Sequence, residues 1–246
     1  MAEEICNESY KISTPIIILC EGAADKSFLN LIIKEGKFER FFSVPFPMEK
    51  SPLNTGNTSV SNFPEMIDYL AADKKGFDEI LQGIIIIADK GFGEKKTYNK
   101  ICKSFRNTKY ADKIPKNINE ISKGHPFILI YLIPEMDTGG GLEKLFIDAI
   151  FEECEGLKEC INSYISCCSK SKIKIDDLGP EKQAKSYLQC IIAVLNKEDP
   201  NKSLNYLLRN KKWPSFFPDK KIFLKPFIEK FTKWISDFGS ENNRVC

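Results

Sequence analysis

An apolar run that stops abruptly at an acid constrains this chain more than any other feature. Ile16–Cys20 is an unbroken run of five apolar residues, and Glu21 and Gly22 follow it at once. A short run of this kind is typical of a strand buried on both faces, as strands of a parallel sheet are. Gly22 permits a sharp turn, and apolar residues at helical spacing begin at Phe28. The pattern predicts a central strand that ends in a carboxylate, followed by a helix.

Two further runs extend this pattern into an α/β fold. Gly83–Ala88 reads as a strand that ends at Asp89, and Phe127–Ile133 reads as the next strand, with a basic helix expected between them at Glu94–Phe105. A weaker run at Phe41–Phe46 contains prolines, which is typical of an edge strand. Strands that alternate with helices predict right-handed parallel crossovers, and therefore a parallel sheet flanked by helices.

The chain changes character after Thr138. Amphipathic patterns predict only helices there, and no strand pattern of comparable strength follows. We therefore expect an α/β domain in residues 1–150 and a helical C-terminal extension, residues 151–246, packed on it. The helices expected after Thr138 are Leu142–Ile150, Leu157–Cys168, Gln183–Leu195, Ser203–Arg209 and Phe223–Phe238.

Composition indicates an ordinary globular protein. The chain of 246 residues is 42% hydrophobic and 28% charged, which is typical of a globular protein rather than a disordered one. The acidic N-terminus has no apolar segment typical of a secretory signal, and no apolar run approaches the roughly 20 residues of a membrane span. Nine cysteines, an odd number, favour reduced thiols. These features predict a cytoplasmic protein with no membrane partner.

Charge is unevenly distributed although the net charge is only +2. Residues 90–123 hold ten Lys or Arg against three Asp or Glu, and residues 201–234 hold nine against two. Residues 135–159 between them hold eight acids and two bases. Acids that hold a cation, flanked by bases that hold a phosphate backbone, would suit a metal site acting on a phosphodiester. Solvated helix faces explain the basic segments equally well.

Three motifs together resemble the TOPRIM superfamily, the topoisomerase–primase domain. The first is the apolar strand followed by Glu21-Gly22, two residues, Asp25 and Phe-Leu at the helix start. The second is Asp89 after its strand, where the family has Asp-x-Asp. The third is strand, Pro, acid and then Gly-Leu-Glu-x-Leu at 141–145. The likeness covers nearly the whole chain and is closest to small stand-alone TOPRIM-like proteins related to OLD-type nucleases.

This resemblance implies a TOPRIM-like Rossmannoid sheet and a divalent-metal-dependent, nuclease-like activity on DNA or RNA. The resemblance implies Mg²⁺ or Mn²⁺ as cofactor. It is also compatible with a homodimer or with a separate partner subunit. Glu21 would act as general acid/base or metal ligand, and Asp89 as the main ligand. Supporting ligands would be Asp25, Asp137 and Glu143.

The second motif departs from the family pattern. Asp89-Lys90-Gly91 has glycine where the family has its second Asp, so a metal there would lose one negative ligand unless Glu94, Glu135 or Asp137 replaced it. Lys90, with Lys95 and Lys96, could hold a phosphate by charge. A catalytically degenerate module that binds nucleic acid, a nucleotide or a protein partner without cleavage is therefore the alternative.

Local structural roles compete with the chemical ones. Asp25 and Glu143 fall in the first turns of predicted helices, where the helix dipole favours a carboxylate. Asp89 could cap a helix or turn after its strand. Glu21, between a buried strand and a glycine, has no comparable local role, so the functional interpretation is strongest there.

Other candidates carry weaker signals. Gly139–Gly141 could cradle an anion, although the run lacks the Lys-Ser/Thr of a P-loop and also suits a simple turn. Cys154, Cys160, Cys167 and Cys168 do not have zinc-module spacing, and we expect them to pack in the core. Trp213 and nearby phenylalanines could stack on bases, but anchoring of the last helix is the favoured interpretation.

Overall fold

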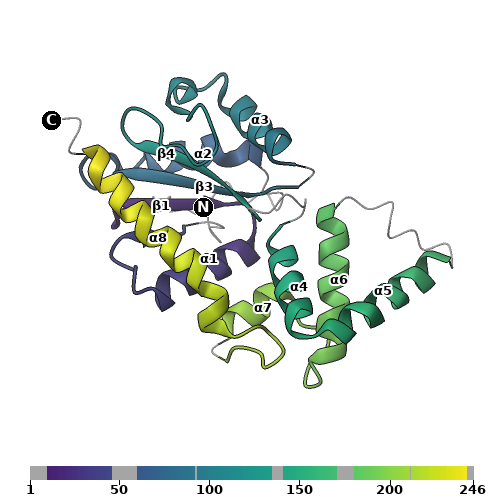
Figure 1. Ribbon diagram of the computed structural model, residues 1–246. Coiled ribbons are helices and arrows are strands. Elements are labelled where there is room, and N and C mark those ends of the chain that lie inside the picture. Colours follow the sequence, from purple (N-terminus) through teal and green to yellow (C-terminus); the bar gives the residue numbers. More distant parts are fainter. Residues whose placement is uncertain are drawn as a thin grey trace, which may run out of the picture.

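The computed structural model describes residues 10–45, 60–91, 93–134, 141–170, 180–210 and 212–242. Its centre is a parallel sheet of four strands in the order β2-β1-β3-β4 (Figure 1). The strands are β1 (Ile16–Cys20), β2 (Phe42–Ser43), β3 (Gly83–Asp89) and β4 (Phe127–Ile133). The predicted parallel sheet flanked by helices, with helices at the C-terminal end, is therefore confirmed.

Helices account for most of the remaining described chain. They are α1 (Ala23–Glu35), α2 (Phe63–Leu70), α3 (Glu94–Phe105), α4 (Leu142–Glu153), α5 (Glu155–Lys170), α6 (Pro180–Leu195), α7 (Leu204–Arg209) and α8 (Lys220–Asn242). Short helical turns lie at Val60–Asn62, Gly76–Ile80 and Ala111–Lys113. Each helix predicted after Thr138 is present, as is the predicted Glu94–Phe105. Of the strand expected at Phe41–Phe46, the structure has Phe42–Ser43 as β2, and Phe46 lies outside the described residues. Pro45 has no amide hydrogen with which to extend the ladder.

Helices cover both faces of the sheet. Helices α1 and α8 lie on one face, and α2 and α3 lie on the other (Figure 1). The chain leaves β1 toward β2 on one side, whereas β3 lies on the other side of β1 and leads on to β4. The order of the strands therefore reverses between β1 and β3. Open α/β sheets place their ligands outside the carboxyl ends of the strands at such a reversal.

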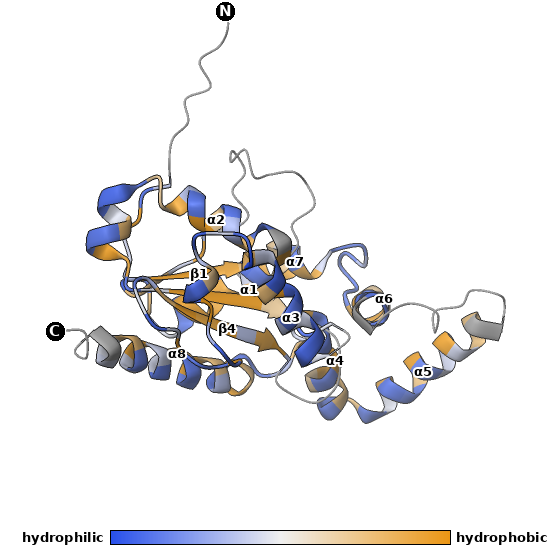
Figure 2. Ribbon diagram, turned by 90° about the horizontal axis from the view of Figure 1, so that it is seen from above, coloured by the Kyte–Doolittle hydropathy of each residue, from blue (hydrophilic) through white to orange (hydrophobic). Residues whose placement is uncertain are grey.

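The sheet forms the centre of the hydrophobic core. All residues of β1 and β4 are buried, and the strands appear as an orange layer between amphipathic helices in Figure 2. Helix α8 approaches the sheet closely, since a Cβ added to Gly83 would lie 2.2 Å from the ring of Phe238. Strands covered on both faces explain why their sequences are continuous apolar runs without polar alternation.

An aromatic cluster connects the C-terminal helices to the sheet layer. Phe146 of α4 lies with its ring centroid 5.9 Å from that of Phe28 in α1 and 4.8 Å from that of Phe223 in α8. Trp213 packs beside Phe217 at 5.1 Å, and its indole N–H donates to the carbonyl of Pro218. Trp213 thus anchors the chain before α8.

Helix α5 projects away from the sheet (Figures 1 and 2). Its buried side chains include Ile161 and Ile165, whereas Cys154, which precedes it, and Cys160 and Cys167 are exposed. The prediction that these cysteines pack in the core is therefore wrong, because only one side of the projecting helix meets other elements. Among the described helices, none combines the length and apolarity that crossing a bilayer requires.

Candidate functional site at the carboxyl edge of the sheet

Glu21 and Asp89 lie side by side at the carboxyl ends of β1 and β3. The register of these strands pairs Cys20 with Ile87, which brings the residues that follow to the same edge. The backbone amide of Asp89 donates a hydrogen bond to Oε1 of Glu21 at 3.2 Å. Both acids are partly buried. The parallel sheet thus brings the two acids that the sequence singled out to one point, at the reversal of strand order.

The carboxylate of Asp89 also meets the start of α4. Its Oδ1 accepts a hydrogen bond from the amide of Leu142, the first residue of α4, at 3.2 Å. The fit is close at Gly141, where an added Cβ would lie 2.4–2.5 Å from the Asp89 carboxyl atoms. The predicted capping role is present, but Asp89 caps α4 rather than α3, the helix that follows its own strand. The requirement for glycine at 141 was not evident in the sequence, where the glycine run suggested only a turn or an anion cradle.

Asp25 and Glu143 occupy the helix positions that their sequence context suggested. Asp25 is the third residue of α1, and its Oδ2 accepts a hydrogen bond from the amide of Gly22 at 2.8 Å. Glu143 is the second residue of α4 and is partly buried. Both carboxylates therefore lie at helix N-termini, where the dipole favours negative charge whether or not a ligand is present.

The thiol of Cys20 is affected by the charged side chains at this edge. Cys20, the last residue of β1, is fully buried directly before Glu21. Burial raises the pKa of the Cys20 thiol well above its usual value. The negative charge of Asp25 adds to that effect, the positive charge of Lys26 opposes it, and Glu21 and Asp89 add smaller contributions. Three carboxylates and one ammonium group therefore lie near enough to the end of β1 to act on this thiol.

Lys90 points into the protein. It is only 4% exposed, and its Nζ lies 3.5 Å from Oε2 of Glu94. Its backbone amide donates to the carbonyl of Ile133 in β4, so both the backbone and the ammonium group of Lys90 have partners at the sheet edge. A phosphate at Lys90 would have to compete with Glu94, whereas Lys95 and Lys96 in the first turn of α3 are exposed.

The two acids could hold Mg²⁺ jointly with a substrate. Within the described residues, no three His, Cys, Asp or Glu side chains gather as a metal-binding group. Mg²⁺ commonly takes only one or two protein carboxylates and completes its shell with water and substrate phosphates. Glu21 and Asp89 supply two such carboxylates at one edge. Glu135 and the predicted ligand Asp137 lie outside the described residues.

The fold and this edge define a class: a parallel α/β protein with acids at the ends of two neighbouring strands, where the strand order reverses. A family model described as "Protein of unknown function (DUF3226)" matches residues 15–238, so the chain belongs to that family. The match spans the sheet, α1 to α7 and most of α8. Comparison with curated proteins and with solved structures gave no match.

Proposed function

We propose that this protein is a divalent-metal-dependent, nucleic-acid-processing protein with nuclease-like phosphodiester chemistry at the Glu21–Asp89 edge. The observation that carries the proposal is the 3.2 Å hydrogen bond from the Asp89 backbone amide to Glu21 Oε1, which holds the Glu21 carboxylate against the end of the strand that carries Asp89, at the reversal of strand order. The sequence resemblance to the TOPRIM superfamily supports the same chemistry. DNA or RNA would be the substrate, in the cytoplasm.

The two acids would have different tasks. Asp89, whose carboxylate accepts a hydrogen bond from the start of α4, would serve as the main ligand of Mg²⁺ or Mn²⁺. Glu21 would complete the metal site or exchange a proton with the attacking water or the leaving oxygen. The bound ion would polarise the phosphoryl oxygens and lower the pKa of a water molecule. Asp25 and Glu143 would contribute negative charge from the adjoining helix N-termini.

A module that binds nucleic acid, a nucleotide or a protein partner without cutting is the second candidate. It is favoured by the hydrogen bonds of three of the acids. Glu21, Asp89 and Asp25 each accept a backbone N–H, so each already has a role in the fold. Glycine at 91, in place of the family's second Asp, points the same way.

Metal binding and cleavage separate the two candidates. Mn²⁺ binding would be measured by electron paramagnetic resonance for the wild-type protein, Glu21→Gln and Asp89→Asn. Both replacements keep an oxygen that can accept the original backbone hydrogen bond, so the fold should persist. Cleavage of single- and double-stranded DNA and RNA would be assayed with the same proteins.

The proposed enzyme should bind Mn²⁺ and cut at least one substrate, and both properties should fall at least about tenfold in the two variants. Glu65→Gln, an exposed acid in the first turn of α2, is the matched control and should behave as wild type. Metal binding without cleavage, or neither, would favour the binding module.

A further inference from the structure

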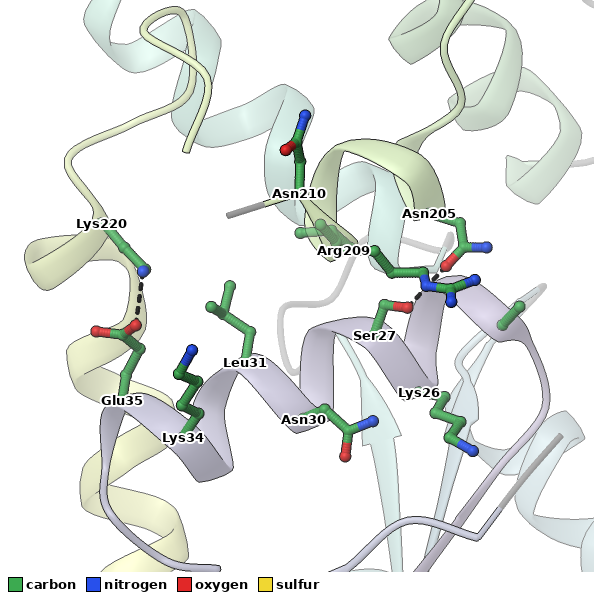
Figure 3. Close-up of a pocket in the computed structure, with 12 residues that line it drawn as sticks. Lys26, Ser27, Asn30, Leu31, Lys34, Glu35, Asn205, Arg209, Asn210 and Lys220 are labelled. Atoms are coloured by element: carbon green, nitrogen blue, oxygen red, sulfur yellow. Dashed lines mark hydrogen bonds and ion pairs between the residues drawn. The ribbon is translucent and has the colours of Figure 1, made fainter. Parts of the chain in front are cut away.

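A polar pocket lies along α1, beside the proposed site. It has a volume of about 600 Å³, within the range of small-molecule sites, and lies between α1, α7 and the start of α8 (Figure 3). Its wall begins at Ala23, two residues beyond Glu21, and extends to Glu35. The 13 residues of α1 make this wall about 18 Å long from first to last. The pocket therefore starts at the end of α1 that adjoins the acidic edge.

The charge of the pocket is opposite to that of the edge. Four cationic side chains line it, Lys26, Lys34, Arg209 and Lys220, against the single acid Glu35. Lys26, Asn30 and Lys34 are spaced four residues apart and so lie on one side of α1. Side chains of Ser27, Asn205 and Asn210 add hydrogen-bonding groups.

The pocket is assembled from distant parts of the chain. Ser27 Oγ donates to Oδ1 of Asn205 at 2.7 Å, a contact across 178 residues that fixes α7 against α1. At the other end, Lys220 Nζ pairs with Glu35 Oε1 at 2.6 Å, and Figure 3 shows Leu31 and Lys34 of α1 lying between these two contacts. The walls are thus held in place before any ligand binds.

Two of the cations are not neutralised by an ion pair. In the part of the chain that the structure describes, neither Lys34 nor Arg209 is paired with a carboxylate, and both are exposed. The Lys220–Glu35 pair is partly exposed, and such pairs contribute little, so an anion could exchange with Glu35 there. Arg209 offers a planar fork of donors suited to phosphate.

We propose that this pocket binds nucleotide phosphates, and that a nucleic-acid strand lying in it reaches the Glu21–Asp89 edge. The identity of the ligand as nucleic acid rests on the proposed function, whereas binding of phosphate in the pocket does not require the metal site. An anion-binding wall next to an acidic edge separates the two tasks: the cations hold the backbone, and the acids hold the metal.

The test measures the binding of fluorescein-labelled single-stranded DNA and RNA oligonucleotides by anisotropy, with EDTA present so that no metal site forms. Lys34→Gln combined with Arg209→Gln should weaken binding by about tenfold. Two lost contacts to a single strand should also reduce the slope of log affinity against log salt by about 1.4. A labelled mononucleotide, tested alongside, distinguishes a strand from a free nucleotide as the source of the phosphates.

Two double variants serve as controls. Lys74→Gln with Lys75→Gln removes exposed charges next to Asp73, which contacts the chain before β1 at the opposite end of the sheet, and should leave binding unchanged. Lys95→Gln with Lys96→Gln tests the exposed lysines of α3. Loss of binding in the α3 variant but not in the pocket variant, or no binding of either probe, overturns the inference.

The inference and the proposed function can fail separately. Oligonucleotide binding in EDTA that depends on Lys34 and Arg209, without cleavage under any metal, supports the pocket and refutes the enzyme. Cleavage that depends on Glu21 and is unaffected in the Lys34 and Arg209 double variant, in both KM and kcat, supports the enzyme and refutes the pocket as the site of strand binding.

Discussion

The side chain of Glu21 accepts a hydrogen bond from the backbone amide of Asp89 at 3.2 Å, across 68 residues of sequence. This contact ties together the ends of β1 and β3 beyond the last residues of their ladder. It also gives Glu21 a structural role at the place where the sequence suggested only a chemical one.

Replacing Glu21 with alanine should therefore destabilise the protein. The amide of Asp89 would lose its acceptor in a partly buried position, which costs about 1–2 kcal/mol in the free energy of unfolding. Glu21→Gln keeps an acceptor and should remain within about 0.5 kcal/mol of wild type. Urea unfolding measures both. A gain in stability for Glu21→Ala would instead show that repulsion among the neighbouring acids outweighs the hydrogen bond.

The close approach of Gly141 to Asp89 predicts a coupled pair of mutations. Gly141→Ala would place a Cβ 2.4–2.5 Å from the Asp89 carboxyl atoms and should cost about 1–3 kcal/mol. In an Asp89→Ala background the obstructing atoms are absent, so the same change should cost much less. A double-mutant cycle by urea unfolding gives the coupling energy, which should be about 1 kcal/mol or more.

Gly156 is the matched control for this pair. It lies near the start of α5, and an added Cβ would meet no atom within 4 Å. Gly156→Ala should leave stability unchanged or raise it by up to about 1 kcal/mol, because alanine is the better helix former. Equal losses for Gly141→Ala and Gly156→Ala would argue against the close contact with Asp89.

Helix α8 should contribute strongly to stability. Phe231 is 1% exposed, and its ring centroid lies 4.9 Å from that of Phe42 in the edge strand β2. Phe231→Ala should lower the free energy of unfolding by about 3–5 kcal/mol. Ile222, 75% exposed on the same helix, is the control, and Ile222→Ala should change it by less than about 0.5 kcal/mol. Similar values for both would mean that α8 is not firmly packed.

Stability should rise with pH in the alkaline range through Lys230. Burial, with a smaller contribution from nearby Lys233, lowers the pKa of Lys230 to about 8 from 10.5. Between these two pH values the unfolded chain binds more protons at this residue than the folded chain does, so raising the pH favours folding. Below about pH 8 Lys230 is protonated in both the folded and the unfolded state. Burial of its charged ammonium then lowers the free energy of unfolding by its full amount.

The Lys230 effect is isolated by comparison with variants. Lys230→Met should remove that residue's share of the increase in urea midpoint between about pH 8 and pH 10. Lys225→Met, an exposed lysine on the same helix, should retain it. The ammonium of Lys230 lies 4.4 Å from the ring centroid of Tyr131. If Lys230→Met keeps the full increase, this cation–π contact holds the lysine charged and the pKa is not lowered.

Local sequence patterns predicted most of the elements of this fold. Ile16–Cys20 and Phe127–Ile133 could be assigned as strands because a strand buried on both faces needs an unbroken apolar run. The helices after Thr138 were predictable because their apolar residues recur with the helical period. The ends of these elements also placed Glu21 and Asp89 at strand termini, where a ligand site was to be expected.

Tertiary structure alone decided which residues meet. The strand order put Glu21 beside Asp89, the start of α4 met the carboxylate of Asp89, and α7 closed the pocket along α1 through Ser27 and Asn205. It also buried Lys90 and left Cys160 exposed. The periodicity of a segment depends on its own residues and can be read locally. Contacts between distant segments, such as the one across 185 residues between Glu35 and Lys220, depend on topology and packing, which no local pattern encodes.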